Sequence, residues 1–153
     1  MARYGFKAIR VGSSTLDVAS ITTAAASPRR FQIFDFTLGS DASPADNAFL
    51  WEISTHTAKD SSGASFGSVV TGVALDSSDT IASTVICLQS AVTNLGAGST
   101  IFGVPLNQRA SFRWVASPGS EFVAPATACN GFAIATPTAS AVNIEAYTLV
   151  NEL

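Results

Sequence analysis

The stretch Ala48-Phe49-Leu50-Trp51-Glu52-Ile53-Ser54-Thr55 predicts a β-strand by its alternation. Phe49, Trp51 and Ile53 would share one face of the strand, and Glu52 and Ser54 the other. Successive side chains of a strand point to opposite faces of the sheet, so the pattern is typical of a strand with one buried face. The sequence offers no comparable helical period with caps. The alternation therefore favours an all-β fold.

Outward from this stretch, short apolar runs alternate with Gly, Pro, Ser, Asn and Asp along the whole chain. About ten such strands predict an antiparallel β-sandwich of two packed sheets, with a jelly roll as the leading topology. Residues 1–27 form either an N-terminal arm that adds a strand to a neighbour or an edge strand of the same sheet, and 28–153 form the sandwich domain. A short helix at 44–47 or 90–94 stays open. The runs interpreted as strands are 4–11, 15–22, 31–38, 48–55, 69–75, 83–89, 100–106, 110–116, 121–124, 132–136 and 141–150.

Local patterns add faces and turns to this outline. In the third run, Phe34, Phe36 and Leu38 are expected on one face, opposite Asp35 and Thr37. Two dipeptides then predict hairpins further along the chain.

The first of these is Pro118-Gly119, a type II turn signal that would join 110–116 to 121–124 in a hairpin. The second is Asn130-Gly131. Pro105 places the run 100–106 near a strand end or on a sheet edge, because proline lacks the backbone N–H that a central strand needs.

The chain is poor in charge and rich in small residues. Its 153 residues amount to about one domain, and its 12% charged residues are about half the ~25% of typical soluble proteins. It contains 25 Ala, 20 Ser and 15 Thr, is 47% hydrophobic, and has a mean hydropathy of +0.34. Intrinsic disorder is excluded by this apolar content. Either Ser and Thr solvate the surface, or other subunits cover much of it.

Charge and hydropathy also narrow the partners. A net charge of −3 and a pI of about 4.9 argue against a nucleic-acid partner, because no general field attracts phosphate. The weakly polar stretch 122–142 is interrupted by Pro125, Asn130 and Pro137, so we expect no membrane segment. Asp17 interrupts any apolar core of a signal peptide near the N-terminus.

One pattern matches a hydrolase motif and fails on its context. Gly63-Ala64-Ser65-Phe66-Gly67 fits G-x-S-x-G, which requires a preceding strand, a following helix and a downstream histidine. Here a polar loop precedes the pattern, a β-like run follows it, and the only histidine, His56, lies upstream. We interpret Ser65 as a loop residue and His56 as a surface or loop histidine. The sequence therefore predicts no catalytic residue and no enzyme.

Metal and redox chemistry find equally little support. Asp76-Ser77-Ser78-Asp79, and Asp41 with Asp46, are acidic loop pairs, but the spacing of a calcium loop is absent, so turn formation is favoured. Cys87 and Cys129 are interpreted as small buried hydrophobes, with a disulfide left open. We expect no metal and no cofactor.

Four of the eight basic residues and one acid are the candidate interface residues. Arg29 and Arg30 follow Pro28 just before a strand, and a solvated strand face explains them equally well. Arg109 and Arg113 lie near the aromatic run 110–116, and the head of Arg113 is expected to pair with a neighbour's carboxylate. Glu121, just after the Pro118-Gly119 signal, completes the set.

Four stretches carry a family resemblance, best matched over 107–131. They are Asn107-Gln108-Arg109-Ala110-Ser111-Phe112-Arg113-Trp114-Val115-Ala116-Ser117-Pro118-Gly119-Ser120-Glu121, Pro125-Ala126-Thr127-Ala128-Cys129-Asn130-Gly131, Pro28-Arg29-Arg30, and Ala45-Asp46-Asn47 leading to Leu50-Trp51. With them the chain resembles small virion structural proteins of tailed bacteriophages.

The resemblance implies a protein of the phage particle, most specifically a capsid decoration (cement) protein. Such a protein would form a homotrimer, bind the phage major capsid protein on the outer capsid surface, and be assembled in the bacterial host cytoplasm. A clamp across subunit joints would stabilise the shell by binding only its assembled state. Two alternatives stay open: a tail, neck or fibre-associated virion component, and a carbohydrate-binding β-sandwich module that stacks sugars on Trp51 or Trp114.

Overall fold

The chain folds into two antiparallel β-sheets. The computed structural model describes residues 1–12, 14, 16–24, 26–41, 43–57, 69–80, 85–88, 99–137 and 142–153. All of the regular elements within these ranges are strands, and every pair of strands is antiparallel. The predicted all-β, antiparallel class is thus confirmed, and the jelly roll stays a prediction. Residues 44–47 are not helical, and 90–94 lie outside the described residues.

The first sheet has the order β10–β3–β12–β1–β6, with β9 pairing on the same strand, β3. Its strands are β1 (Arg3–Val11), β3 (Phe31–Asp41), β6 (Val73–Ala74), β9 (Phe112–Val115), β10 (Phe122–Ala124) and β12 (Asn143–Glu152). The second sheet has the order β5–β7–β2–β11–β4–β8. Its strands are β2 (Ala19–Thr23), β4 (Ala48–His56), β5 (Val69–Val70), β7 (Val85–Leu88), β8 (Thr100–Asn107) and β11 (Gly131–Ala135).

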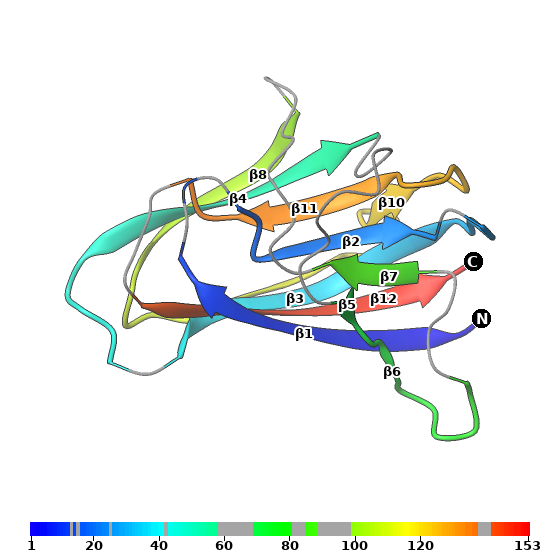
Figure 1. The fold of residues 1–153 in the computed structure, drawn as a ribbon, viewed down its shortest axis with the longest axis horizontal. Coiled ribbons are helices and arrows are strands. Elements are labelled where there is room, and N and C mark those ends of the chain that lie inside the picture. The colour runs from blue at the N-terminus through cyan, green and yellow to red at the C-terminus, as the bar shows by residue number, and fades with distance from the viewer. Residues whose placement is uncertain are drawn as a thin grey trace.

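The two sheets pack face to face around one hydrophobic core. Phe49, Trp51 and Ile53 of β4 are 5%, 0% and 1% exposed, which confirms the alternation that predicted this strand. Phe31 of β3 meets Phe132 of β11 edge-on across the two sheets, with 6.1 Å between ring centroids. Figure 1 shows the strands running along the long axis of the molecule, with both termini at one end.

In the second sheet, burial extends to both faces of the central strands. All five residues of β2 and all five of β11 are buried. Phe132 and Ile134 belong to the core, whereas the alternate Ala133 and Ala135 are outside the core cluster and still only 0% and 3% exposed. Small residues on the outer face of this sheet are therefore enclosed within the chain. This enclosure accounts for part of the high Ala and Ser content.

The N-terminal segment lies within both sheets of this single chain. Over its full length, β1 pairs with β12, from Arg3 opposite Asn151 to Val11 opposite Asn143. An inner strand of the second sheet, β2, pairs with β7 and β11. From the sequence, residues 1–27 were expected to form either an arm or an edge strand. In this chain β1 pairs with β12 on one side and with β6 on the other.

A β-bulge at Phe34 overturns the expected faces of β3. Opposite β12, Leu149 pairs with Asp35 and Val150 with Ile33, so Phe34 is an extra residue on β3. The bulge changes the alternation, and the prediction that Phe34 shares the buried face of Phe36 was wrong. Phe34 is half-buried, and the guanidinium of Arg3 lies 5.9 Å from its ring centroid.

Both predicted hairpins were wrong, although one of the turns is present. Gly119 has φ +86° and Ser120 N–H donates to Ser117 O at 2.9 Å, as a type II turn requires. However, β9 and β10 do not pair with each other. Both pair antiparallel with β3, one after the other, so residues 116–121 loop out of a single interrupted edge strand.

The Asn130-Gly131 signal marks a crossover between the sheets, because β10 belongs to the first sheet and β11 to the second. The expected single strand 69–75 was also wrong: β5 joins the second sheet and β6 the first.

Pro105 lies in β8, an edge strand of its sheet in the described part of the chain, as predicted. Just beyond the end of the same strand, Gln108 N–H donates to Asn47 O at 2.9 Å, so Gln108 and Asn47 form a hydrogen-bonded pair that continues the β4–β8 ladder. Hydrogen-bonded and non-hydrogen-bonded pairs alternate along an antiparallel ladder. Pro105 therefore belongs to a non-hydrogen-bonded pair, and its backbone nitrogen points away from β4. Its missing N–H therefore falls on the free edge of the strand.

Candidate functional site

Arg113 makes its ion pair within the chain. Its Nε lies 3.2 Å from both carboxylate oxygens of Asp35, and its Nη2 lies 2.5 Å from Asp35 Oδ2. The two side chains project from neighbouring strands, β9 and β3, and Asp35 is 5% exposed. The carboxylate raises the pKa of Arg113 by hydrogen bonding and by its charge. The carboxylate partner is therefore Asp35, 78 residues away in the same chain and on the adjacent strand of the same sheet, in place of the neighbour's carboxylate that the sequence suggested.

Arg29 and Arg30 lie beside the C-terminus. Arg29 Nε is 3.5 Å from Glu152 Oε1, and the Arg30 carbonyl accepts a hydrogen bond from Leu153 N–H at 2.9 Å. The Glu152 carboxylate that pairs with Arg29 also acts on Tyr4: burial of the Tyr4 side chain, and then this carboxylate, raise the pKa of Tyr4. The side chain of Arg30 is exposed and borders a hollow of about 410 Å³ that Val123 also lines.

Arg109 precedes the interrupted edge strand, and Glu121 lies in the loop that interrupts it between β9 and β10. Arg109 is exposed in the turn after β8, where its backbone N–H donates to Asn107 Oδ1 at 2.9 Å. Glu121 is half-buried at the end of the 116–121 loop. The five candidate residues therefore do not form one cluster: Arg109, Arg113 and Glu121 follow one edge of the first sheet, and Arg29 and Arg30 adjoin the C-terminal end.

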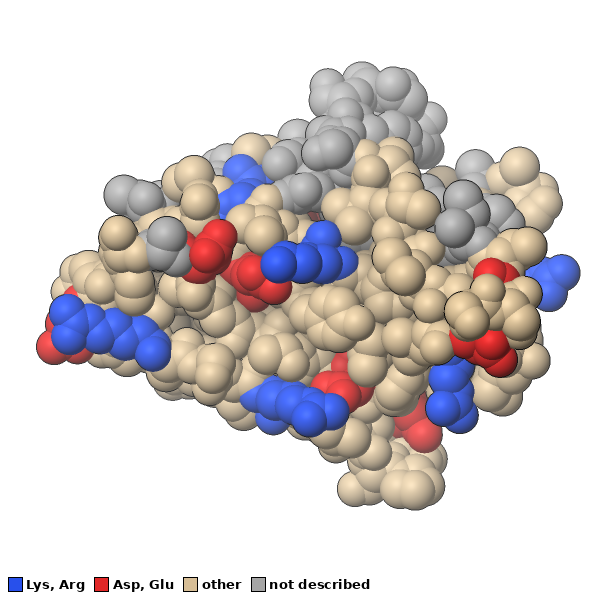
Figure 2. All heavy atoms as spheres, turned by 90° about the horizontal axis from the view of Figure 1, so that it is seen from below, with Lys and Arg blue, Asp and Glu red and all other residues tan. Residues whose placement is uncertain are grey.

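Charges of opposite sign pair across the outer face of the first sheet. Lys7 Nζ lies 3.3 Å from Glu145 Oε1, in addition to the Arg113–Asp35 pair. Figure 2 shows the basic and acidic side chains of this view as separate groups, mostly beside one of opposite sign, with wide uncharged surface between them. Paired charges present little net field at this surface.

A group of half-buried aromatic side chains lies where β8 faces β9 and β10. We call it the aromatic edge: Phe102 of β8, Phe112 and Trp114 of β9, and Phe122 of β10. Phe102 and Phe112 have ring centroids 5.7 Å apart, which links the edge strands of the two sheets. Trp114 stacks on Phe122 at 4.6 Å.

Exposed aliphatic side chains accompany the aromatic edge on the same strands. Ile101, Val115 and Val123 are 45%, 56% and 40% exposed. Sequence reasoning had found the strands that carry these residues but had not grouped them. By strand alternation Val115 and Val123 lie on the outer face of the first sheet and Ile101 on the outer face of the second, opposite to the inward aromatic side chains of the same strands. The aromatic edge itself depends on β8 and β9 being edge strands of facing sheets, which no local pattern encodes.

Neither tryptophan offers an open ring for a sugar. Trp51 is 0% exposed in the core, and Trp114 stacks on Phe36 at 5.1 Å as well as on Phe122. A carbohydrate site built on stacking needs an accessible ring face. The residues named for the carbohydrate alternative are thus engaged in core and edge packing.

His56 is buried, so its assignment to the surface was wrong. It is 6% exposed at the end of β4, and its Nδ1 lies 3.1 Å from Cys129 O, so Nδ1 carries the proton and donates it. Burial lowers the pKa of His56 to about 4. Its Nε2 has no hydrogen-bond partner in the described ranges. Cys129 is a free, partly buried thiol.

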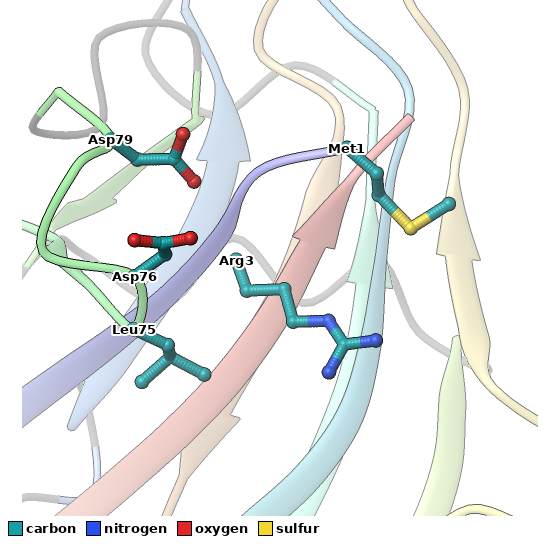
Figure 3. A pocket seen from close by; sticks show the side chains of 5 residues that line it. All are labelled: Met1, Arg3, Leu75, Asp76 and Asp79. Carbon is teal, nitrogen blue, oxygen red and sulfur yellow. The ribbon is translucent and has the colours of Figure 1, made fainter.

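The acidic segment after β6 forms a turn, as predicted. Asp79 N–H donates to Asp76 O at 3.0 Å, and Ser78 N–H to Asp76 Oδ1 at 2.9 Å. The hydrogen bonds from Ser78 lower the pKa of Asp76. Together with Met1, Arg3 and Leu75 these acids line a hollow of about 380 Å³. Figure 3 shows the guanidinium of Arg3 pointing away from the two carboxylates.

Other sequence candidates give no further site. Asp46 Oδ1 accepts a hydrogen bond from Asn107 Nδ2 at 2.7 Å, which ties the loop before β4 to the end of β8. Across the ranges that the structure covers, no three His, Cys, Asp or Glu side chains come together as a metal-binding group. Ser65 with its G-x-S-x-G pattern, and the side chain of Cys87, lie outside the described residues. The described part of the chain contains no helix long and apolar enough to cross a membrane.

Comparison with known proteins gave no match: no family model, no curated protein and no solved structure matches this chain. The likeness to virion structural proteins therefore stays a prediction from the sequence.

Proposed function

We propose that this chain is a non-enzymatic structural protein of a tailed-phage virion, and specifically a capsid decoration protein. It would bind the outer shell, bridge major capsid subunits and act as a homotrimer. The stretch that carries most of the resemblance, 107–131, spans β9, β10, the 116–121 loop and the crossover to β11. It includes three of the four aromatic-edge residues, Phe112, Trp114 and Phe122. Resemblance and geometry therefore point to the same side of the molecule.

The aromatic edge is the observation that carries the proposal. Its four side chains lie at the border of the core, and Ile101, Val115 and Val123, on the outward faces of the same strands, are about half exposed. Covering apolar surface contributes about 25 cal/mol per Å² removed from water. A subunit docked on this side would bury these side chains and complete the core at the border between the two sheets.

The in-chain ion pairs support an apolar mode of assembly. Arg113, Lys7 and Arg29 each lie within ion-pair distance of a carboxylate of the same chain. Breaking such pairs to contact another subunit would cost free energy, particularly at the nearly buried Asp35. The partner surface is therefore expected to contact uncharged side chains and leave these pairs in place.

A three-fold assembly needs two different surfaces on each subunit. Rotational symmetry of order three places one patch of a protomer against a second patch of the next. The aromatic edge supplies two unlike sides, β8 of the second sheet and β9–β10 of the first. This arrangement supports a ring of three protomers around the aromatic edge.

Co-sedimentation with expanded capsids tests the proposal. The wild-type chain should sediment with the capsids, and the variant Val115→Glu/Val123→Glu should remain in the supernatant, because two charges would be buried at the docking surface. The matched control is Val73→Glu, which changes a 67% exposed valine on β6 at the other edge of the first sheet. Equal binding by the wild type and the double variant, or absence of the chain from purified particles, overturns the proposal.

A tail, neck or fibre position is the alternative within the virion. A tail, neck or fibre component would have the same fold as a capsid decoration protein, would likewise catalyse no reaction and would likewise assemble with other subunits. Only the partner would differ. Binding to purified tails in the same sedimentation assay, with no binding to capsids, would favour it.

A further inference from the structure

The crossover between β10 and β11 ends in a tight turn at residues 127–130. Asn130 N–H donates to Thr127 O at 3.2 Å, and Cys129 adopts φ +61°, in the left-handed region that a non-glycine residue seldom occupies. Holding a residue in this region costs of order 1 kcal/mol or more and requires support from its surroundings. The turn is therefore a segment whose geometry depends on external contacts.

One set of contacts comes from Thr23 at the end of β2. Cys129 N–H donates to Thr23 O at 3.2 Å, and Thr23 N–H donates to Asn130 O at 3.0 Å. The Thr23 hydroxyl donates to Thr127 O and accepts from Asn130 N–H. Threonine hydroxyls do not titrate in the physiological range, so these contacts add no pH dependence of their own and report the opening of the turn.

The other contact comes from His56 at the end of β4. Its Nδ1–H donates to the carbonyl of Cys129, the residue with the strained backbone. The imidazole is 6% exposed, and its Nε2 finds no acceptor or donor in the part of the chain that the structure describes. A second proton would therefore place a buried positive charge beside an unsatisfied N–H.

We propose that His56 is an acid-sensitive latch: the neutral imidazole holds the 127–130 turn closed, and protonation of Nε2 favours its release. The described elements around His56 contribute few titratable groups. On β11 and β2 the residues of the same face are Gly131, Ala133, Thr22 and Ser20, which do not titrate. Before β2, the buried Asp17 carboxylate accepts a hydrogen bond from the Ser20 hydroxyl at 2.6 Å. On β4 itself Glu52 is four residues away, roughly 13 Å along the strand. In the turn, the titratable group is the Cys129 thiol.

The sign and size of the effect follow from linkage. Burial lowers the pKa of His56 to about 4 in the closed turn, against about 6.5 when the side chain is hydrated. The contribution of His56 to closure is fully present above pH 6.5 and is lost as the pH falls from 6.5 toward 4. From these two values, the opening equilibrium should increase about 30-fold between pH 8 and pH 5.

Amide hydrogen exchange of the full chain measures this opening directly. We expect the Thr23 and Cys129 amides, corrected for the intrinsic pH dependence of exchange, to open about 30-fold more at pH 5 than at pH 8. The amide of Ala116, which bonds to Phe34 O at 2.9 Å in the first sheet, is the internal control and should not change.

The matched variant is His56→Asn, whose side-chain amide can donate to Cys129 O and does not titrate. It should remove the pH dependence of the Thr23 and Cys129 amides. The same dependence in the variant, or no dependence in the wild type, overturns the proposal. Should His56→Asn not fold, a proton NMR titration of the wild-type imidazole decides: titration near pH 6.5 overturns the latch, and titration well below it supports the latch.

Discussion

Gly131 shows how one residue sets the spacing of two strands. A Cβ at this position would lie 1.9 Å from the Ile21 carbonyl oxygen and 2.9 Å from Thr22 Cα, both backbone atoms of β2. Atoms that close cannot be relieved by a side-chain rotation, so the strands must separate. The Asn130-Gly131 dipeptide looks like a turn signal in sequence, but glycine is required here for close approach between β11 and β2.

We therefore expect Gly131→Ala to lower the free energy of unfolding by about 3 kcal/mol or more. The control is Gly103→Ala on β8, where a Cβ would meet the Trp51 carbonyl oxygen at an ordinary 3.8 Å. Urea unfolding followed by tryptophan fluorescence gives both values. A loss at position 131 no larger than at position 103 contradicts the close approach.

Asp35 and Arg113 form the second residue-scale prediction. Asp35 is 5% exposed, and its carboxylate pairs with the Arg113 guanidinium. Arg113→Met leaves the Asp35 carboxylate without its ion-pair partner. It should therefore destabilise the fold more than the double variant Arg113→Met/Asp35→Asn does. Thermal unfolding of the two single variants and the double variant measures this order. Additive effects would show that the two side chains are independent.

At the scale of elements, the sequence predicted what depends on neighbours along the chain. The alternation of 48–55 located β4 and its buried face, and Pro118-Gly119 located a type II turn, because both signals are local. Pairing partners were not predictable in the same way. The extra residue at Phe34 and the end-to-end placement of β9 and β10 on β3 are set by register with distant strands.

In the candidate site, too, the sequence predicted what depends on single residues and their neighbours in the chain, and did not predict contacts between distant strands. Arg113 was singled out correctly as a residue with a carboxylate partner, but the partner, Asp35, is 78 residues away in the chain and adjacent in the sheet. The aromatic edge is a property of two edge strands from different sheets. Finding it needs the sheet order, which the alternation of single strands does not contain.

Pro105 carries the element-scale prediction. Its nitrogen faces the free edge of β8, so Pro105→Val would add an outward N–H to a mostly uncharged edge strand. We expect the variant to form concentration-dependent species larger than those of the wild-type chain. Sedimentation velocity over a range of concentrations detects them, with Pro125→Val, outside any strand, as the control. Identical profiles for both variants and the wild type would mean that Pro105 does not protect this edge.

At the scale of the whole molecule, the low charge has two structural sources. The outer face of β2 and β11 is enclosed within the chain and needs small uncharged residues. On the first sheet, Lys7 pairs with Glu145 and Arg113 with Asp35, and wide uncharged surface lies between such groups in Figure 2. The aromatic edge places four half-buried aromatic side chains at the border between the two sheets, and we attribute it to contact with other subunits.

An electron cryomicroscopy reconstruction of the purified phage particle tests this central claim most directly. The account predicts density for the two-sheet sandwich on the outer capsid, with β8, β9 and β10 in contact with another subunit. Absence of the chain from the particle, or a sandwich whose aromatic edge faces solvent on every copy, would contradict it.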